Sequence, residues 1–348
     1  MIALGVIGYG YWGPNLVRNF MEVPGVRVHT ISDLQASRLL QAAGRYPSVK
    51  TTTDHREILA DPAIDALAIA TPVSTHFDLA LQALRAGKHV FVEKPLAATV
   101  EEGQQLVEEA SRLNRILMVD HTFVYTSAVR KIRQLVREGR LGRLYYYDSV
   151  RVNLGLFQHD VNVLWDLAAH DLSIMDYVLD SRPTAVAATG ISHVSGRPQN
   201  LAYLTCFFEG NLIAHFHVNW LAPVKIRRTL IGGDRQMIVY DDLEVSEKVK
   251  VYDRGITLNN GPEGIYQLLV GYRAGDMWAP QLEPVEALHT ETLHFIECIR
   301  TKSKPLTDGE VGLRILRILD AATRSMNQRG QPVEMNWDPL QKAGIVDD

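Results

Sequence analysis

The chain has 348 residues, 46% hydrophobic and 22% charged, which is ordinary for a globular protein and long enough for two domains. Its net charge is −4, from 36 basic and 40 acidic residues without a long basic run, so we expect neither nucleic acid nor an anionic membrane as a partner. No apolar run could span a bilayer, and Cys206 and Cys298 form no disulfide or metal-binding pattern. We therefore expect a cytoplasmic protein.

A glycine pattern follows the first apolar segment. Residues 2–7 predict a buried strand, and the apolar spacing over residues 14–21 predicts a helix. The G-x-G-x-x-G pattern between them is typical of a turn that brings backbone amides to a pyrophosphate. A glycine-rich turn that serves packing alone is the alternative. The candidate cofactor contacts here are Gly8, Gly10, Tyr11, Trp12 and Gly13.

An aspartate ends the second expected strand, over residues 26–31. Asp33 lies about 20 residues after the fingerprint, where an acidic side chain binds the ribose hydroxyls of the adenosine. Its charge would repel a 2′-phosphate, and no arginine follows it immediately, so we predict NAD(H) as the cofactor rather than NADP(H). Alternatively, Asp33 caps the helix expected to begin near Ala36.

Strands and helices continue to alternate, as in a doubly wound α/β sheet. The strand expected at 65–70 runs into Thr71 and Pro72, which we predict to contact the cofactor. His76 either contacts the cofactor or simply begins the next helix. We predict that this Rossmann domain covers residues 1–121.

The apolar run at residues 90–92 ends abruptly at Glu93, Lys94 and Pro95. A proline cannot donate to the ladder, so the chain should leave the sheet there, at the carboxyl edge where ligands bind in parallel sheets. Glu93 and Lys94 are therefore predicted to reach the cofactor, and Lys94 to reach the substrate as well. The alternative is an ordinary charged loop.

Residues 122–348 have a different pattern, which predicts an α+β domain with a large open, mainly antiparallel sheet. Two helices, over 286–300 and 309–327, should close the chain. The expected strands are 143–154, 184–193, 201–208, 211–220, 226–231, 236–240 and 248–252.

An acid and a histidine stand four residues apart in a helical pattern before the second of these strands. Asp166 and His170 should therefore share one helix face, where a carboxylate could orient the imidazole for proton transfer. A surface or capping pair is the alternative. His215 and His217 lie on one side of a strand without a third ligand, so we expect no metal.

The chain contains, in this order, the glycine fingerprint, Asp33, Thr71–Pro72, Glu93–Lys94–Pro95 and the Asp166/His170 pair. With these features it resembles the glucose–fructose oxidoreductase / inositol dehydrogenase / MocA (GFO/IDH/MocA) family. The resemblance implies an NAD(P)-dependent oxidoreductase with Lys94, Asp166 and His170 as catalytic residues. It also implies a homodimer or homotetramer built through the C-terminal sheet.

Within the family, residues 145–153 and 163–172 look most like enzymes that oxidise carbon 3 of UDP-N-acetylglucosamine or its uronate. Arg151 and Asn153 lie on one side of a strand and are predicted to bind the substrate, Arg151 by pairing with the diphosphate; an ion pair across the sheet is the alternative. Phe157, Gln158 and His159 could contact the sugar or the uracil. An inositol or free-sugar dehydrogenase, or a regulator that binds a dinucleotide without turnover, are the other readings.

The ordinary pKa values favour His170 over Lys94 as the base. Histidine needs almost no shift from about 6.5, whereas lysine must fall by roughly three units from about 10.4. We therefore predict that His170 takes the alcohol proton and that Lys94 stabilises the charge on the same oxygen.

Overall fold

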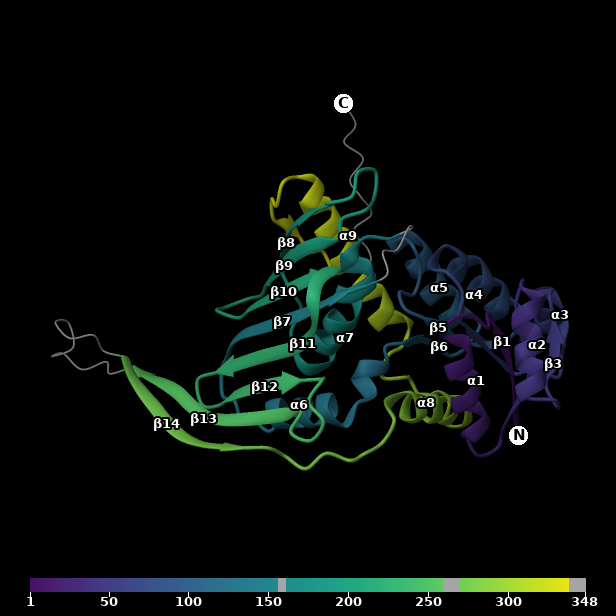
Figure 1. The fold of residues 1–348 in the computed structure, drawn as a ribbon, viewed down its shortest axis with the longest axis horizontal. Helices are drawn as coiled ribbons and strands as arrows, with labels where there is room; N and C mark the ends of the chain where they lie inside the picture. Colours follow the sequence, from purple (N-terminus) through teal and green to yellow (C-terminus); the bar gives the residue numbers. More distant parts are fainter. Residues whose placement is uncertain (156–160, 259–269, 338–348) are drawn as a thin grey trace.

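The computed structural model describes residues 1–155, 161–258 and 270–337. These residues form two sheets, one in each half of an elongated molecule (Figure 1). The predicted α/β fold class, with a Rossmann sheet followed by a second large sheet, is confirmed. No described helix is both long and apolar enough to cross a membrane.

The first sheet is six-stranded and parallel throughout, in the order β3-β2-β1-β4-β5-β6. Its strands are β1 (Ile2–Ile7), β2 (Val26–Ser32), β3 (Lys50–Thr52), β4 (Ala66–Ile69), β5 (His89–Glu93) and β6 (Leu117–Asp120). The helices are α1 (Gly13–Glu22), α2 (Ala36–Arg45), α3 (His55–Ala60), the 3₁₀ turn η1 (Val73–Thr75), α4 (His76–Arg85) and α5 (Val100–Arg112). Because the strand order reverses beside β1, a ligand site is expected at the carboxyl ends of β1 and β4.

Local sequence explains these boundaries. The residues of β4 and β6 are all buried, as expected for strands covered by helices on both faces. Helix α5 begins with a capping box, in which the Thr99 side chain accepts from the Glu102 amide at 3.2 Å and the Glu102 carboxylate accepts from the Ala98 amide at 3.1 Å.

The second sheet has nine strands in the order β14-β13-β12-β11-β7-β10-β9-β8-β15. All of its neighbours are antiparallel except β7 and β10, which run parallel, so the sheet is mixed rather than purely antiparallel. The strands are β7 (Leu144–Leu154), β8 (Ala185–Ile191), β9 (Leu201–Phe207), β10 (Ile213–Asn219), β11 (Leu221–Gly233), β12 (Met237–Asp241), β13 (Val249–Leu258), β14 (Val270–Trp278) and β15 (Val333–Glu334). β14 and β15 were not predicted, and β11 begins earlier than expected.

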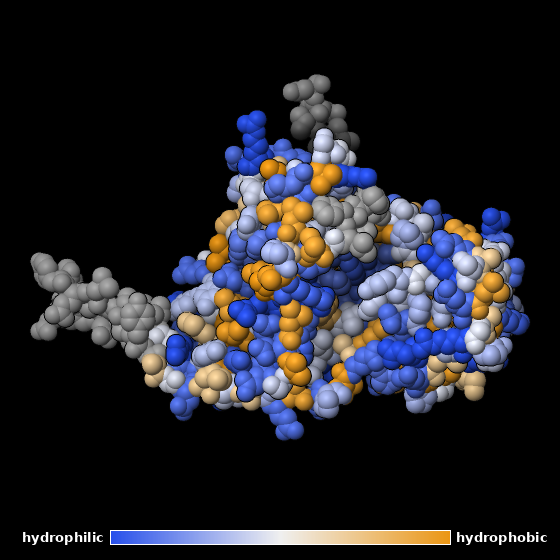
Figure 2. Space-filling view, viewed as in Figure 1, coloured by the Kyte–Doolittle hydropathy of each residue, from blue (hydrophilic) through white to orange (hydrophobic). Residues whose placement is uncertain are grey.

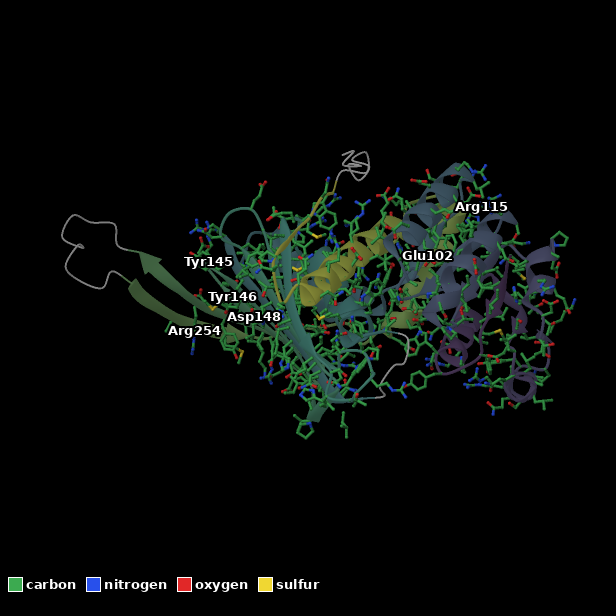
Figure 3. All side chains as sticks on the ribbon, turned by 90° about the horizontal axis from the view of Figure 1, so that it is seen from above. Glu102, Arg115, Tyr145, Tyr146, Asp148 and Arg254 are labelled. Atoms are coloured by element: carbon green, nitrogen blue, oxygen red, sulfur yellow. The ribbon has the colours of Figure 1, made fainter. Side chains whose placement is uncertain are left out.

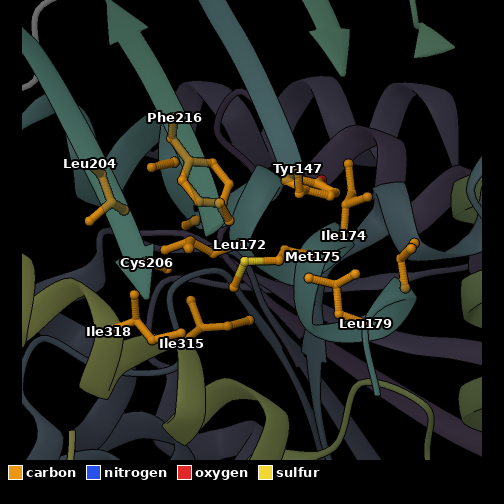
Figure 4. Packing of buried hydrophobic residues seen from close by; sticks show 14 of the residues in the cluster. Tyr147, Leu172, Ile174, Met175, Leu179, Leu204, Cys206, Phe216, Ile315 and Ile318 are labelled. Atoms are coloured by element: carbon orange, nitrogen blue, oxygen red, sulfur yellow. The ribbon is translucent and has the colours of Figure 1, made fainter. Parts of the chain in front are cut away.

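Helices cover one face of this sheet. They are the 3₁₀ turn η2 (Thr122–Tyr125), α6 (Ser127–Arg137), the π-helical turn η3 (Leu164–Ala168), α7 (Ala169–Val178) and α9 (Gly309–Asn327). Helix α8 (Ala287–Thr301) lies on the first domain instead. Side chains of α7, of α9 and of the inner sheet face interlock in one buried cluster, which includes Leu172, Met175, Ile315, Phe216 and Cys206 (Figure 4).

The last two helices return to the first domain. α8 lies against α1, and α9 lies against α5. Phe295 of α8 packs edge-on against Phe20 and Phe91, with ring centroids 6.2 and 5.5 Å apart. The division at residue 121 therefore stays a prediction, since the end of the chain adds helices to both halves. β13 and β14 extend well beyond the other strands, with Arg254 on this extension (Figures 1 and 3).

Candidate active site

A cleft of about 750 Å³ lies at the carboxyl edge of the first sheet. It runs along the ends of β1, β2, β4 and β5, the position that the topology indicates for a dinucleotide. Predicted cofactor residues on its wall are Gly8, Gly10, Tyr11, Trp12, Asp33, Thr71, Pro72, Glu93 and Lys94.

The glycine loop has the shape that a dinucleotide requires. Gly8 has φ of +97°, and a Cβ added to it would lie 2.3 Å from the Ala70 carbonyl oxygen. A Cβ on Gly13 would lie 2.2 Å from the Gly8 carbonyl oxygen. Because neither position admits a side chain, the turn stays tight and its backbone amides at the start of α1 stay accessible to phosphate. The residues present therefore fit a bound dinucleotide.

Asp33 is buried at the far end of the cleft. Its carboxylate accepts from the amides of Tyr9 at 2.7 Å and of Gln35 at 2.8 Å, so it holds the glycine loop and the turn that leads into α2. Helix α2 itself begins after Gln35, without a side-chain cap. The Arg38 guanidinium lies 3.4 Å from the same carboxylate. No arginine immediately follows Asp33 in the sequence, so Arg38 was not predicted; the first turn of α2 brings it back toward the carboxylate.

His76 lies beneath the cleft wall rather than on it. It is 1% exposed, and its ring nitrogens lie 2.8 Å from the carbonyl oxygens of Pro95 and of Thr71. Burial lowers the pKa of His76, more than its two backbone contacts raise it. The imidazole thus ties together the two loops that carry Thr71 and Lys94, and we withdraw it as a direct cofactor contact.

Lys94 bridges the two halves of the molecule. Its Nζ donates to the Asp166 carbonyl oxygen at 2.9 Å and lies 3.3 Å from Asp166 Oδ1. The other oxygen of Asp166 accepts from Trp220 Nε1 at 2.9 Å. The carboxylate therefore positions Lys94 at the rim of the cofactor cleft.

The predicted Asp166–His170 pair does not form a hydrogen bond in the described structure. Asp166 lies in the π-helical turn over residues 164–168, which is wider than an α-helical turn, whereas His170 lies in the α-helix that follows it. Asn162 begins this turn, and its side-chain oxygen accepts from the amides of Leu164 at 3.0 Å and Trp165 at 3.3 Å. Asp166 instead pairs with Lys94, and the His170 imidazole is hydrogen-bonded to neither of these two described residues.

His170 stands at the start of α7 with its ring edge-on to Phe123, the centroids 5.0 Å apart. Its Nδ1 is buried and has no hydrogen-bond partner among the described residues. Burial, and next the positive charge of Lys94, hold the pKa of His170 well below its usual range. His170 therefore does not keep the ordinary histidine pKa on which its choice as the base rests. Its imidazole is neutral at neutral pH, as a general base must be, but it is a weaker base than an ordinary histidine.

Arg151 is buried rather than open to substrate. Its side chain is 4% exposed, and its Nε and Nη2 bind the two oxygens of Asp171 at 2.7 and 3.1 Å. The prediction that it pairs with a diphosphate is contradicted, because Asp171 already occupies its fork. Asn153, on the same side of β7, is half-buried, and Phe157, Gln158 and His159 lie outside the described residues.

A second arginine, which sequence reasoning missed, takes the more open position. Arg227 of β11 pairs in register with Arg151 of β7 and lies over the Phe123 ring at 5.4 Å. It is about one-third exposed and contacts Asp242 at 3.1 Å. Its charge also contributes to lowering the pKa of His170, after burial and nearer cations. Only the cross-strand pairing of β7 with β11 could have revealed it.

His215 and His217 lie on the opposite, uncovered face of the sheet. Both stack against Tyr203, with centroids 6.1 and 4.7 Å away. Among the described residues, no three His, Cys, Asp or Glu side chains are placed to hold a metal ion. The expectation of a metal-free site stays a prediction.

Comparison with known proteins fits this arrangement. Residues 2–121 match the family described as "Oxidoreductase family, NAD-binding Rossmann fold", and residues 129–239 match the "GFO/IDH/MocA C-terminal domain". The chain is 26% identical to the scyllo-inositol 2-dehydrogenase (NAD(+)) of Bacillus subtilis, over 97% of this chain and 95% of that protein.

Two further similarities concern sugar chemistry and the cofactor. The UDP-N-acetylglucosamine 3-dehydrogenase of Acidithiobacillus ferrooxidans is 25% identical over 90% of this chain and 93% of its own. The crystal structure of GenD2 from gentamicin A biosynthesis, in complex with NAD, superposes with a TM-score of 0.80 at 21% identity, covering 96% of each chain. With an NAD-binding Rossmann domain and the matching C-terminal domain, this chain belongs to the GFO/IDH/MocA family of oxidoreductases.

Proposed function

We propose that this protein is an NAD-dependent dehydrogenase that oxidises a secondary hydroxyl on the ring of an anionic sugar, a UDP-N-acetylhexosamine or its uronate, at carbon 3. The observation that carries the proposal is the place of Lys94, which lines the cofactor cleft, is held by Asp166 and acts electrostatically on the neutral His170. Bound NAD supplies the hydride acceptor.

The side chains divide the remaining work. His170 takes the hydroxyl proton, since its imidazole is neutral and the residue is only partly buried. Lys94 donates a hydrogen bond to the same oxygen and stabilises its developing negative charge. Asp166 holds Lys94 in place, and Trp220 in turn holds Asp166. Both proton-handling residues would be unnecessary in a regulator without turnover.

Charge around His170 favours an anionic substrate. The Arg151 charge is matched by Asp171, and the Lys94 charge by Asp166. Asp242 contacts both Arg227 and Lys248, so one positive charge remains in excess there. We propose Arg227 as the side chain that meets a phosphate or the uronate carboxylate, since its planar fork suits either group.

An inositol dehydrogenase is the second candidate. The burial of Arg151 supports it, because the expected diphosphate contact is not available. The similarity to a scyllo-inositol 2-dehydrogenase supports it as well. Both candidates use the same Lys94 and His170, so they differ only in what binds beyond the reacting ring.

Calorimetric titration of the NAD-loaded protein separates them. UDP-N-acetylglucosamine and UDP should bind, free N-acetylglucosamine should bind much more weakly, and turnover should follow the nucleotide sugar. Arg227→Gln should weaken UDP binding about tenfold or more, corresponding to one charge-assisted contact. Arg228→Gln is the matched control, since Arg228 is the next residue and pairs with Asp241. If UDP adds no affinity and only inositols turn over, the nucleotide-sugar proposal fails.

We also propose that a second copy of the chain covers the open face of the nine-stranded sheet. Hydrophobic patches gather over this sheet (Figure 2), and Tyr203 and Ile213 are each 41% exposed. Asp148, labelled on β7 in Figure 3, lies opposite His215 on β10, so polar side chains stand beside these apolar ones on the same sheet. Tyr203→Glu should lower the mass measured by light scattering to that of one chain. Val245→Glu, at a 96% exposed position outside the face, should not. An unchanged mass for Tyr203→Glu would contradict this interface.

Both cysteines are free and buried, as we expect in the cytoplasm.

A further inference from the structure

Three carboxyl groups meet behind the Lys94 end of the cofactor cleft. Glu93 ends β5 and lies beside Asp120, which ends β6. Glu291 reaches Asp120 from helix α8, in the C-terminal part of the chain. Glu93 also forms part of the cleft wall, so the carboxyl cluster of Glu93, Asp120 and Glu291 adjoins the cofactor site directly.

The three carboxyl groups of this cluster differ in how many hydrogen bonds they accept. Asp120 accepts from Trp12 Nε1 at 2.9 Å, from the Thr122 amide at 3.2 Å and from the Thr122 hydroxyl. Glu291 is 0% exposed, and neither of its carboxyl oxygens has a hydrogen-bond partner among the described residues. One oxygen of Glu93 is also buried without a partner there. A fully buried carboxylate without donors is costly, so Glu291 avoids the charge by holding a proton.

Packing of α8 keeps Glu291 in this place. Phe295 follows it by one helical turn and is fixed in the aromatic group with Phe20 and Phe91. Leu288 and Ile296 of the same helix are buried in the same core. The helix therefore cannot turn Glu291 toward water without breaking this core.

Few positive charges are available to the carboxyl cluster. Lys94 acts on Glu93, but it is already paired with Asp166. His121 lies beside Asp120 and is neutral, because burial lowers its pKa to about 4. The Tyr125 phenol faces Glu291 and is neutral as well, because burial raises its pKa well above the usual range. Burial, and next the charge of Asp120, raise the pKa of both Glu93 and Glu291 well above the usual range. All three carboxyls cannot be ionised together.

We propose that the carboxyl cluster exchanges a proton with solvent according to the charge of the nicotinamide, and that Glu291 is the positioning residue that holds this proton. The oxidised nicotinamide ring is a cation and the reduced ring is neutral. Hydride exchange must take place beside Lys94 and His170, so the ring lies at the Glu93 end of the cleft. A cation there favours the ionised form of a nearby carboxyl group.

The proton balance of the proposal is simple. Binding of NAD⁺ ionises one carboxyl and releases its proton to solvent, with no covalent bond to carbon formed or broken. Binding of NADH leaves the cluster protonated. The cluster thus matches its own charge to the redox state of the cofactor, and the substrate proton still goes to His170. The inference rests on the proposed roles of Lys94 and His170, which place the nicotinamide ring, and it is the same whether the substrate is a nucleotide sugar or an inositol.

Calorimetry with the whole protein measures this exchange. NAD⁺ and NADH are each titrated in two buffers of different ionisation enthalpy, and the difference in heats gives the protons released. We expect NAD⁺ to release more protons than NADH, by up to one. Glu291→Gln, which keeps shape but cannot ionise, should remove at least half of this difference. Glu297→Gln, at an exposed position on the same helix, should leave it intact.

A pH series supplies the second measurement. The ratio of NAD⁺ to NADH affinity should rise with pH, by up to about tenfold per unit for one linked proton. This rise should flatten in Glu291→Gln. Equal proton release for the two cofactors would overturn the proposal. So would a difference that persists undiminished in a folded Glu291→Gln protein, since Glu291 would then not hold the exchanged proton.

Discussion

The two halves of the site hold their side chains in different ways. In the cofactor half, Gly8, Asp33 and Lys94 are each placed by the end of a parallel strand, so backbone topology alone brings them to one edge. In the substrate half, side chains are placed by ion pairs between elements far apart in the chain, as in Lys94–Asp166 and Arg151–Asp171. Strand ends tolerate local changes, whereas each buried pair depends on both of its partners.

The largest effects are expected where the two halves meet. Lys94→Met and His170→Asn should each lower kcat by about 10²-fold or more, since each removes one partner of the proton transfer. Lys94→Met should be the more severe, because it also leaves the Asp166 carboxylate without its cation. Steady-state kinetics on the substrate that turns over best provides the measurement.

Lys50→Met, at an exposed position on β3, is the control and should keep normal turnover. His170→Asn with near-normal kcat and an unchanged pH profile would contradict the assignment of the base. Lys94 would then be the base, and proton transfer would depend on that residue alone.

A second variant tests how strongly the substrate half depends on its buried pairs. Asp171→Asn leaves the Arg151 guanidinium buried without a counter-charge, and should lower the free energy of unfolding by about 3–5 kcal/mol. Urea denaturation at constant pH measures the loss. Replacing both partners, Arg151→Met with Asp171→Leu, should recover much of it.

Asp180→Asn breaks a pair with Arg137 whose side chains are more than half exposed, and should change stability by less than about 0.5 kcal/mol. Similar losses for Asp171→Asn and Asp180→Asn would remove the distinction between buried and exposed pairs.

The cofactor half should respond more gently. Asp33→Ser removes the charge that opposes a 2′-phosphate and frees Arg38, so NADPH should gain about tenfold in affinity relative to NADH. Arg38→Gln should shift the same ratio in the opposite direction. Fluorescence titration with both reduced cofactors gives the ratio, which is insensitive to any general loosening of the glycine loop. Tighter binding of NADPH by the unaltered protein would overturn the assignment of NAD(H).

The same contrast explains what the sequence could predict. The glycine fingerprint, Asp33 and Lys94 follow from local patterns and from the rule that parallel strands end at one edge. The partner of Asp166 could not be predicted, because Lys94 comes from a segment 72 residues earlier in the chain. The role of Arg227 could not be predicted either, because it depends on the register of β11 against β7. Side chains whose place depends on pairing between distant segments need the structure.

The smallest effect expected is a change in the pH dependence of kcat/KM, which involves residues of both halves. His170 must be neutral to accept the proton, so kcat/KM should fall only below its pKa, which burial and then Lys94 hold well below the usual range for histidine. Arg227 adds to this lowering, so Arg227→Gln should raise the pKa and move the acid limb of kcat/KM to higher pH. Arg228→Gln, whose side chain is 54% exposed and paired with Asp241, should leave the limb in place. A substrate without charge keeps this test independent of anion binding. If the limb does not move in Arg227→Gln, or moves equally in both variants, the cation beside Phe123 does not control His170.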